Sequence, residues 1–332
     1  MEYATVHGTN LTISRIGLGT WAIGGWMWGG TDERQSIRTI HAALYRGINL
    51  IDTAPAYGFG RSEEIIGQAV AEYGRRDEIV LATKCGIEWG QGGLARNSSR
   101  ARLLTEVEDS LRRLRTGYID IYQVHWPDPQ VPIEETAETM RLLHEQGKIR
   151  AIGVSNYSPR QMERFRSVAP LHAVQPPYNL LERSIEGGVL PYARERKVAV
   201  LSYGALCRGL LSGRMKLHTQ FAGDDIRSLD PKFQPPRYSQ YLRAVQELDR
   251  FARRRYHKRV LELAVRWILD QPGITSALWG ARRPDQLTAL DQVLGWKVDA
   301  AADSQIDEII RAAVADPVGP EFMAPPEVVN AA

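Results

Sequence analysis

The sequence predicts an α/β protein folded as a single closed (β/α)8 barrel, or TIM barrel, that takes in all 332 residues. The first reason is that eight short apolar segments alternate with amphipathic helical segments over about 280 residues, as in such barrels. The second is that no linker or low-complexity stretch divides the chain, although its length is also compatible with two domains. One barrel explains this pattern better than two domains do.

The eight predicted strands are short runs rich in Val, Ile, Leu and Ala. Several of them lack the polar alternation of a half-exposed strand, which indicates parallel strands that are buried on both faces. The predicted strands span residues 15–20, 49–53, 79–84, 119–125, 151–155, 173–175, 198–203 and 275–280.

The helices between these strands are recognised by apolar residues at helical spacing and by their end signals. Thr31 is a candidate N-cap for a helix that opens with Asp32 and Glu33. Ser158 is a candidate N-cap as well, because Pro159 follows it at the first helical position. Further helices are predicted over residues 104–114 and 133–143 and around 189–193, 261–268 and 287–293.

Four segments are predicted in addition to the barrel. Residues 1–14 predict a β-hairpin, turning at residues 7–10, that covers the bottom of the barrel. Residues 212–238, after the seventh strand, show no regular pattern, and a loop of this length is usually functional. Residues 302–314 predict an extra helix, and residues 315–332 an irregular, Pro-rich C-terminal tail.

The composition argues against several classes of partner. Forty-two Lys and Arg residues against 39 Asp and Glu residues give a net charge of +3, which is too even to indicate a nucleic acid or an anionic membrane. The two cysteines, Cys85 and Cys207, cannot form a disulfide framework, so we expect a reducing, cytoplasmic location. The seven histidines show no metal-binding spacing, so no metal is expected.

Most of the predicted strands end at a polar side chain. Because the active sites of these barrels lie at the carboxyl ends of the strands, we expect these side chains to share one rim. They are Asp52 with Tyr57 five residues later, Lys84, His125, Ser155 and Asn156, Gln175, Tyr203, and Gly280 followed by Arg282 and Arg283.

Four of these residues suit the reduction of a carbonyl group. A phenol such as Tyr57 is a very weak acid at neutral pH unless its anion is stabilised, and the ammonium of Lys84, held by Asp52, is expected to stabilise it. His125 can orient a carbonyl oxygen and stabilise the charge that develops there. A proton-donating pocket of this kind needs a hydride source, which a nicotinamide provides.

Each of these residues also has a purely structural interpretation. Asp52 and Lys84 alone are compatible with a buried ion pair, Tyr57 with a half-buried loop tyrosine, and His125 with a core histidine. The arrangement of all four at neighbouring strand ends favours catalysis. Residues 17–22 (GLGTWA) match a dinucleotide-binding fingerprint, but no helix is predicted to open at these glycines, so we reject that interpretation.

A set of motifs gives the chain a likeness to a known family over essentially its whole length. They are GLGTW (17–21), NLIDTAPAYG (49–58), ATK (82–84), DIYQVHWP (120–127), GKIRAIGVSNY (147–157), QPPYN (175–179) and YGALCRGLL (203–211). In order and spacing they resemble the aldo-keto reductase superfamily. Residues 21–30 (WAIGGWMWGG) and 277–282 (ALWGAR) are most similar to a bacterial branch with general stress protein reductases and a glycerol/glyceraldehyde dehydrogenase.

The resemblance implies a role for each of the four residues and a cofactor. Tyr57 would be the general acid and base, with Lys84 and Asp52 lowering its pKa and His125 orienting the carbonyl. The cofactor would be NADPH or NADP+. Its contacts are expected at Thr20, Trp21, Ser155, Asn156, Gln175, Tyr203, Gly204, Leu206, Arg208, Gly280, Arg282 and Gln286.

Some of these implied contacts are more specific. Leu206 and Arg208 would line the path of the pyrophosphate, and Arg282 would bind the 2′-phosphate, because a guanidinium is the preferred partner of a phosphate. Trp279 and Leu290 depart from the family pattern, which leaves the adenine contacts undefined. The walls of the substrate pocket are expected at Trp21, Trp26, Trp89 and Trp126.

The expected function is that of an NADP(H)-dependent oxidoreductase acting on small aldehydes, ketones or polyols. An NADP(H)-binding regulatory subunit on the same fold is the alternative, and a cofactor-free barrel lyase or isomerase is a third interpretation. The oligomeric state, the physiological substrate and the favoured direction are not predicted.

Overall fold

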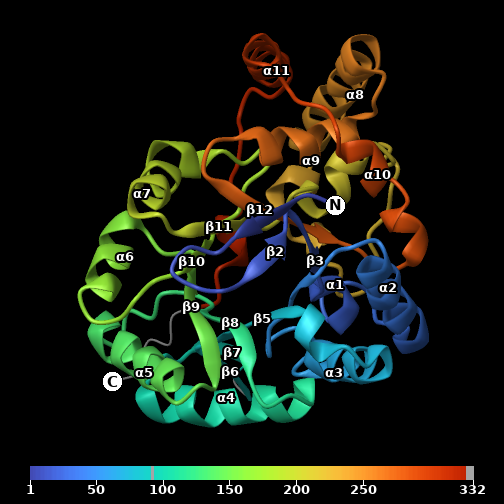
Figure 1. Ribbon diagram of the computed structural model, residues 1–332. Coiled ribbons are helices and arrows are strands. Elements are labelled where there is room, and N and C mark those ends of the chain that lie inside the picture. The colour runs from blue at the N-terminus through green and yellow to red at the C-terminus, as the bar shows by residue number, and fades with distance from the viewer. Residues whose placement is uncertain (91–92, 327–332) are drawn as a thin grey trace.

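The computed structural model describes residues 1–90 and 93–326. Eight parallel strands close into a barrel in the order β10, β11, β12, β3, β4, β5, β8 and β9 (Figure 1), which confirms the predicted (β/α)8 fold. The strands are β3 (Ile16–Gly19), β4 (Leu50–Asp52), β5 (Val80–Cys85), β8 (Ile119–Val124), β9 (Ile149–Ser155), β10 (Ala173–Gln175), β11 (Ala199–Ser202) and β12 (Ile274–Gly280). Each predicted strand coincides with one of them to within a few residues.

Helices surround this barrel. They are α1 (Trp21–Gly24), α2 (Glu33–Tyr45), α3 (Arg61–Tyr73), α4 (Arg100–Leu114), α5 (Ile133–Glu145), α6 (Pro159–Arg166), α7 (Val189–Arg196), α8 (Arg237–Tyr256), α9 (Val260–Asp270), α10 (Leu290–Val293) and α11 (Ala300–Ala313). Helices α8 and α11 pack on each other and stand out beyond the ring of helices (Figure 1).

The helix ends follow local capping chemistry. Ser158 caps α6 and forms a full capping box with Gln161. The cap of α2 is Asp32, whose carboxylate accepts a hydrogen bond from the Gln35 backbone N–H. Thr31 is therefore the wrong N-cap, because an aspartate one residue later can make the same hydrogen bond.

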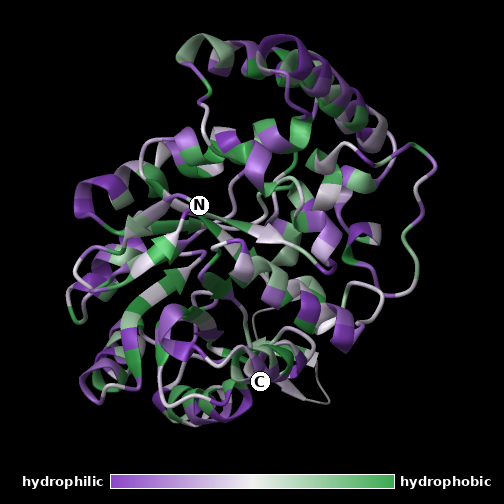
Figure 2. Ribbon diagram, turned by 45° about the vertical axis from the view of Figure 1, so that its right-hand side comes forward, coloured by the Kyte–Doolittle hydropathy of each residue, from purple (hydrophilic) through white to green (hydrophobic). Residues whose placement is uncertain are grey.

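The hydrophobic core has two layers. One lies between the sheet and the helices. The other fills the barrel, where Leu50, Ile121 and Leu201 pack together with Val6 and Ile13 of the N-terminal segment. That segment forms the antiparallel hairpin β1 (Tyr3–Thr5) and β2 (Thr12–Ser14), which crosses one end of the barrel in Figure 1. The strands β5 and β8 are buried along their whole length, whereas the helices alternate between hydrophobic and hydrophilic residues (Figure 2).

Several segments differ from the sequence prediction. A second hairpin, β6 (Ile87–Gly90) and β7 (Gly93–Arg96), follows β5 and is not predicted. The helix predicted around 287–293 consists of a 3-10 turn over Pro284–Leu287 and the single turn of α10. Within the loop 212–238, the structure contains the 3-10 turns Ile226–Ser228 and Pro231–Phe233. In the tail a 3-10 turn forms over Glu321–Met323, and residues 327–332 lie outside the described residues.

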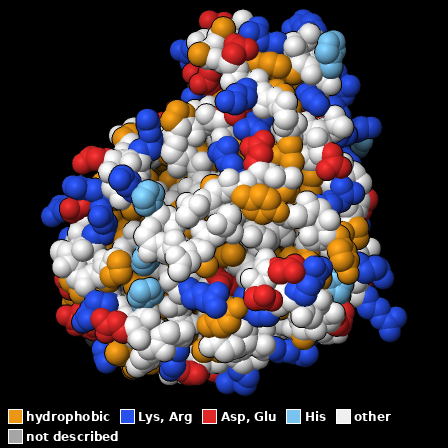
Figure 3. All heavy atoms as spheres, viewed as in Figure 1, with side chains coloured by type: hydrophobic (Ala, Val, Ile, Leu, Met, Phe, Trp, Pro, Cys, Tyr) orange, Lys and Arg blue, Asp and Glu red, His pale blue; other side chains and the backbone are white. Residues whose placement is uncertain are grey.

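The surface is mixed in charge. On the face in Figure 3, basic and acidic side chains are interspersed.

None of the helices in the described part of the chain combines the length and the apolar character that crossing a membrane requires.

Candidate active site

The barrel brings Asp52, Tyr57, Lys84 and His125 together at one rim. Asp52 ends β4, Lys84 lies in β5, and His125 directly follows β8, and these three strands are neighbours in the barrel. Tyr57 lies in the turn between β4 and α3. Asp52 and Lys84 are buried, whereas the rings of Tyr57 and His125 remain partly accessible. The four residues therefore surround one place, with two of them able to touch a bound molecule.

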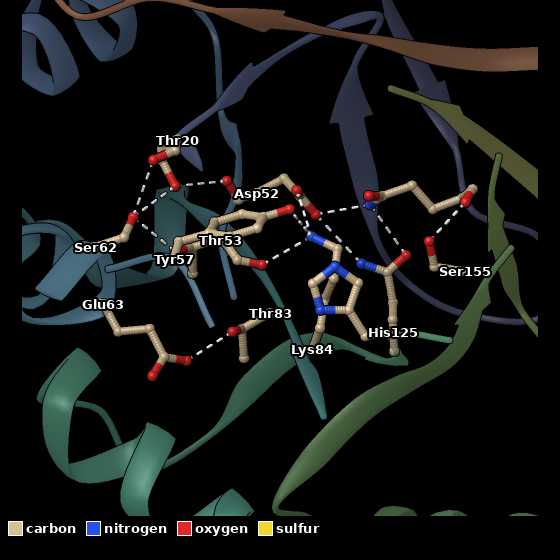
Figure 4. A network of polar contacts seen from close by, with 12 residues as sticks. Thr20, Asp52, Thr53, Tyr57, Ser62, Glu63, Thr83, Lys84, His125 and Ser155 are labelled. Carbon is tan, nitrogen blue, oxygen red and sulfur yellow. Dashed lines mark hydrogen bonds and ion pairs between the residues drawn. The ribbon is translucent and has the colours of Figure 1, made fainter. Parts of the chain in front are cut away.

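Lys84 is at the centre of this group. Its Nζ donates hydrogen bonds to Asp52 Oδ1 at 2.7 Å, to the Thr53 carbonyl at 2.9 Å and to the Tyr57 hydroxyl at 3.3 Å (Figure 4). The Tyr57 and His125 rings meet edge to face, with centroids 5.8 Å apart. The Tyr57 hydroxyl thus has a cation beside it and an imidazole next to its ring.

Two glycines determine where Tyr57 lies. A Cβ on Gly24 would come within 2.5 Å of the Tyr57 carbonyl oxygen, and one on Gly58 within 2.1 Å of the Gly24 carbonyl oxygen. Gly58 also has a φ of 66°, which favours glycine. The backbone of α1 therefore packs directly on the Tyr57 turn, and the Trp21 ring stacks on the Tyr57 ring with centroids 6.0 Å apart.

Burial changes the pKa values of Tyr57, Lys84 and His125. It raises the pKa of Tyr57 well above its usual value, and the Asp52 carboxylate raises this pKa further. The expectation that Lys84 and Asp52 lower the pKa of Tyr57 is therefore corrected. The physical reason is that desolvation of the buried phenol, followed by repulsion between its anion and the Asp52 carboxylate, disfavours the phenolate.

The other two pKa shifts also follow from burial. Burial lowers the pKa of Lys84, and the Asp52 carboxylate opposes that shift. Burial, followed by the charge of Lys84, lowers the pKa of His125 well below its usual value. His125 is therefore neutral at physiological pH and can offer one N–H to an oxygen atom. Tyr57 keeps its proton in the same range.

A glutamine that the sequence analysis misses supports Asp52. Gln123 Nε2 donates to Asp52 Oδ2 at 3.3 Å, and Gln175 Nε2 donates to the same oxygen at 2.8 Å. Gly153 leaves room for Gln123, because a Cβ there would lie 2.7 Å from Gln123 Cγ. A polar side chain inside the apolar strand 119–124 is the signal in the sequence that indicates this role.

The remaining polar residues at the rim form a chain of hydrogen bonds. Ser155 Oγ donates to the Gln175 carbonyl at 2.8 Å. Asn156, with a φ of 63°, donates through Nδ2 to the His125 carbonyl at 3.0 Å and accepts from the Tyr203 hydroxyl at 3.0 Å. This chain fixes the side chains of Asn156 and Tyr203 at one wall of the site.

A cavity of about 340 Å³ opens above these residues. Tyr57, His125, Ser155, Asn156, Gln175 and Tyr203 lie at its polar end. Its other walls are apolar, and they include Trp21, Trp26, Met27, Leu94, Trp126, Ile226, Leu229, Phe322, Met323 and Pro325. The tail residues among them are missed by the sequence analysis, because nothing in an irregular Pro-rich segment indicates where it packs.

Trp89 is not part of the cavity wall, which corrects the prediction for this residue. Its ring lies 6.0 Å from that of Phe59, measured between centroids, and the Arg102 guanidinium stacks on it at 5.7 Å. It belongs to the hairpin β6–β7, whose existence the sequence analysis does not predict.

Arg208 lies in a buried cluster of ion pairs. Its guanidinium pairs with Glu182 and with Asp230, each at 2.5 Å, and only 4% of the side chain is exposed. Lys232 joins this cluster through Glu182 at 2.8 Å. The guanidinium of Arg208 is thus held by two buried carboxylates, which connect the loop 212–238 to the rim.

The other predicted cofactor residues occupy three environments. Thr20 is buried and donates to the Asp52 carbonyl at 2.8 Å. Gly204 and Leu206 lie in the turn after β11, and the Gly204 carbonyl accepts a hydrogen bond from the Asn179 amide at 3.0 Å. Gly280 is exposed at the end of β12.

The segment after β12 places Arg282 close to the loop between α1 and α2. Arg282 Nη1 donates to the Trp28 carbonyl at 2.7 Å, and Nη2 donates to the Gly30 carbonyl. Gln286 Oε1 accepts from the backbone N–H of Arg282 at 2.7 Å. Arg283 pairs with Asp285.

Comparison with known proteins decides the family. The model of the aldo/keto reductase family matches residues 15–311. The chain belongs to the aldo/keto reductase family. It is 61% identical over 326 residues to the aldo-keto reductase YhdN of Bacillus subtilis, which covers 98% of each chain.

Two further relatives extend this assignment. The NADH-specific methylglyoxal reductase of Escherichia coli is 38% identical over 302 residues, covering 86% of this chain and 91% of that one. The structure of the glycerol dehydrogenase AKR11B4 from Gluconobacter oxydans superposes with a TM-score of 0.87 at 51% identity, covering 97% of this chain and 99% of that one. The protein is accordingly an aldo/keto reductase family oxidoreductase with a nicotinamide cofactor.

Proposed function

We propose that this aldo/keto reductase reduces small aldehydes and ketones to alcohols, and catalyses the reverse reaction, with NADP(H) as its preferred cofactor and Tyr57 as the proton donor. The observation that carries the proposal is the position of the Tyr57 hydroxyl, 3.3 Å from Lys84 Nζ and beside His125 at the polar end of the cavity. The methylglyoxal reductase and glycerol dehydrogenase among its relatives support this class of reaction.

Each side chain has a defined task in this reaction. Tyr57 gives its proton to the carbonyl oxygen of the substrate, and its raised pKa means that the phenolate formed needs stabilisation. The Lys84 ammonium stabilises this phenolate as the proton leaves, and Asp52 keeps Lys84 charged. Neutral His125 donates a hydrogen bond to the same carbonyl oxygen and so orients it toward Tyr57.

The donors and acceptors beside Tyr57 fit a nicotinamide. Ser155, Asn156 and Gln175 supply hydroxyl and amide groups suited to a carboxamide, and Tyr203 supplies an aromatic ring on the same wall. When bound, a nicotinamide supplies the hydride that no side chain can provide. Arg208 is left out of this proposal, since Glu182 and Asp230 already hold its guanidinium.

The preference for NADP(H) rests on Arg282. Burial and the nearby charge of Arg227 lower the pKa of Arg282, whereas Asp225, which pairs with Arg227, raises it. A phosphate bound near Arg282 would stabilise its guanidinium and accept hydrogen bonds from it. The Escherichia coli relative is NADH-specific, so the choice between the two cofactors needs a direct measurement.

The proposed setting is a small-molecule enzyme of the cytoplasm. Cys85 and Cys207 are free and buried, which fits a reducing compartment.

The test is a turnover assay with purified protein, using methylglyoxal and glyceraldehyde in one direction and glycerol in the other, each with NADP(H) and NAD(H). We expect Tyr57→Phe to lose at least about 90% of kcat, equivalent to about 1.4 kcal/mol of barrier or more, and to bind NADPH within a few-fold of the wild type. A variant that keeps most of its activity would show that another group donates the proton. Cofactor binding without turnover of any substrate would favour the regulatory-subunit alternative.

A further inference from the structure

The outer wall of the cavity contains the C-terminal tail. Phe322, Met323 and Pro325 line it together with Trp126 and Leu94. These residues come from the tail, from the loop after β8 and from the hairpin β6–β7, three segments that are far apart in the sequence. Something must hold them in register if the wall is to have a defined shape.

Arg96, at the end of β7, joins all three segments. Its Nη2 and Nε donate to the Pro325 carbonyl at 2.9 Å and 3.2 Å, and its Nη1 donates to the Pro127 carbonyl at 3.0 Å. The guanidinium also lies 5.6 Å from the centroid of the Trp126 ring. One planar cation thus binds the tail, the Trp126 loop and its own hairpin in one arrangement.

The composition of the tail makes this contact important. Pro325 and Pro326 have no backbone N–H to donate, so external donors must fix this part of the tail. The earlier part is held differently, because Phe322 packs on the Arg208 guanidinium at 5.5 Å and Met323 Sδ lies 3.8 Å from Arg208 Nη1.

We propose that Arg96 is a specificity-determining positioning residue, which holds the tail as the outer wall of the substrate cavity. The proposal rests on the function proposed above. Carbonyl compounds with an aryl or long alkyl group reach Phe322 and Met323 and gain apolar contact there, so their binding depends on Arg96. A compound with two or three carbons lies at the polar end beside Tyr57 and does not depend on it.

The activity test compares benzaldehyde with methylglyoxal in the variant Arg96→Met, which keeps a long side chain but loses the donors. We expect KM for benzaldehyde to rise about fivefold or more and kcat/KM for methylglyoxal to stay within about twofold. Arg164→Met is the matched control, because it breaks the two-bond contact of an exposed arginine on α6 with Glu134 on α5. It should leave KM and kcat/KM unchanged for both substrates. Equal losses for both aldehydes, or no loss for either, would overturn the proposal.

Two further variants test whether Arg96 acts through the tail. In the double variant Phe322→Ala/Met323→Ala, adding Arg96→Met should change KM for benzaldehyde by less than about twofold, because the apolar wall that Arg96 positions is already gone. A full additional loss would show that Arg96 acts elsewhere.

The rate of cysteine labelling tests the contact between Arg96 and the tail without an activity assay. Both native cysteines are buried, at 1% and 0% exposure, so the variant Met323→Cys can be labelled selectively with a maleimide. We expect Arg96→Met to speed this labelling several-fold and Arg164→Met to leave it unchanged. Equal rates in all three backgrounds would overturn the role of Arg96. If the wild type reduces no aldehyde with either cofactor, the proposed function fails while the labelling rates still decide whether Arg96 holds the tail.

Discussion

The Thr83 hydroxyl donates a hydrogen bond of 2.6 Å to Glu63 Oε1. Thr83 precedes Lys84 on β5, and side chains alternate along a strand, so Thr83 faces the helices while Lys84 faces the site. Glu63 is fully buried on α3 and also accepts from Arg113 Nε at 2.7 Å. The helix layer is therefore tied to the strand that positions Lys84 (Figure 4).

Replacing Glu63 with glutamine tests this connection. Removing one partner of a buried ion pair costs about 3–5 kcal/mol of stability. Because 15% of the Arg113 side chain is exposed and water can solvate it, we expect Glu63→Gln to lower the free energy of unfolding by about 3 kcal/mol, the lower end of that range. Urea unfolding measures this loss. Arg113→Met in the same background should recover part of it, because no unpaired guanidinium remains. If Glu63→Gln leaves the free energy of unfolding unchanged, the stabilising role given to the Glu63–Arg113 pair is wrong.

The stability of the protein should depend on the protonation of Glu106. This carboxylate accepts from the Gly86 backbone N–H at 2.8 Å, and burial raises its pKa to about 8. A raised carboxyl pKa means that the folded state holds a proton that the unfolded state has lost. The contribution of Glu106 to stability is therefore fully present below about pH 4.5, its unfolded value, and is lost as the pH rises toward 8.

The variant Glu106→Gln isolates this effect. Its neutral side chain resembles the protonated acid, so we expect equal stability of variant and wild type near pH 4.5 and a more stable variant at pH 8. Thermal unfolding across this range gives the comparison. A difference in stability that does not change with pH would show that Glu106 does not titrate in the folded protein.

Arg282→Ala tests the cofactor preference. We expect KM for NADPH to rise at least about tenfold, because a charge-assisted contact with the 2′-phosphate is lost, and KM for NADH to rise much less. Arg283→Ala is the matched control, because Asp285 already pairs with this residue. Since Arg282 also binds the carbonyls of Trp28 and Gly30, equal effects on both cofactors would indicate that it only holds that loop.

The barrel and the positions of Asp52, Tyr57, Lys84 and His125 can be predicted from the sequence, because they depend on local patterns. An apolar run specifies a buried strand, and the residue at its carboxyl end is placed at the rim by the barrel itself. No long-range contact has to be known for this step. The same holds for the capping box at Ser158, which is complete within four residues.

Other features depend on partners that are distant in the sequence, and only the tertiary structure decides them. Arg208 looks like a phosphate ligand until Asp230 and Glu182 are seen to hold it, and Trp89 faces Phe59 because of a hairpin that has no strong sequence signal. The pKa of Tyr57 rises because of burial and the nearby Asp52 carboxylate, which are both properties of the assembled site. The sequence by itself thus determines which residues reach the rim, whereas their charge states, and the tail wall held by Arg96, follow from desolvation and packing between segments that meet only in the folded chain.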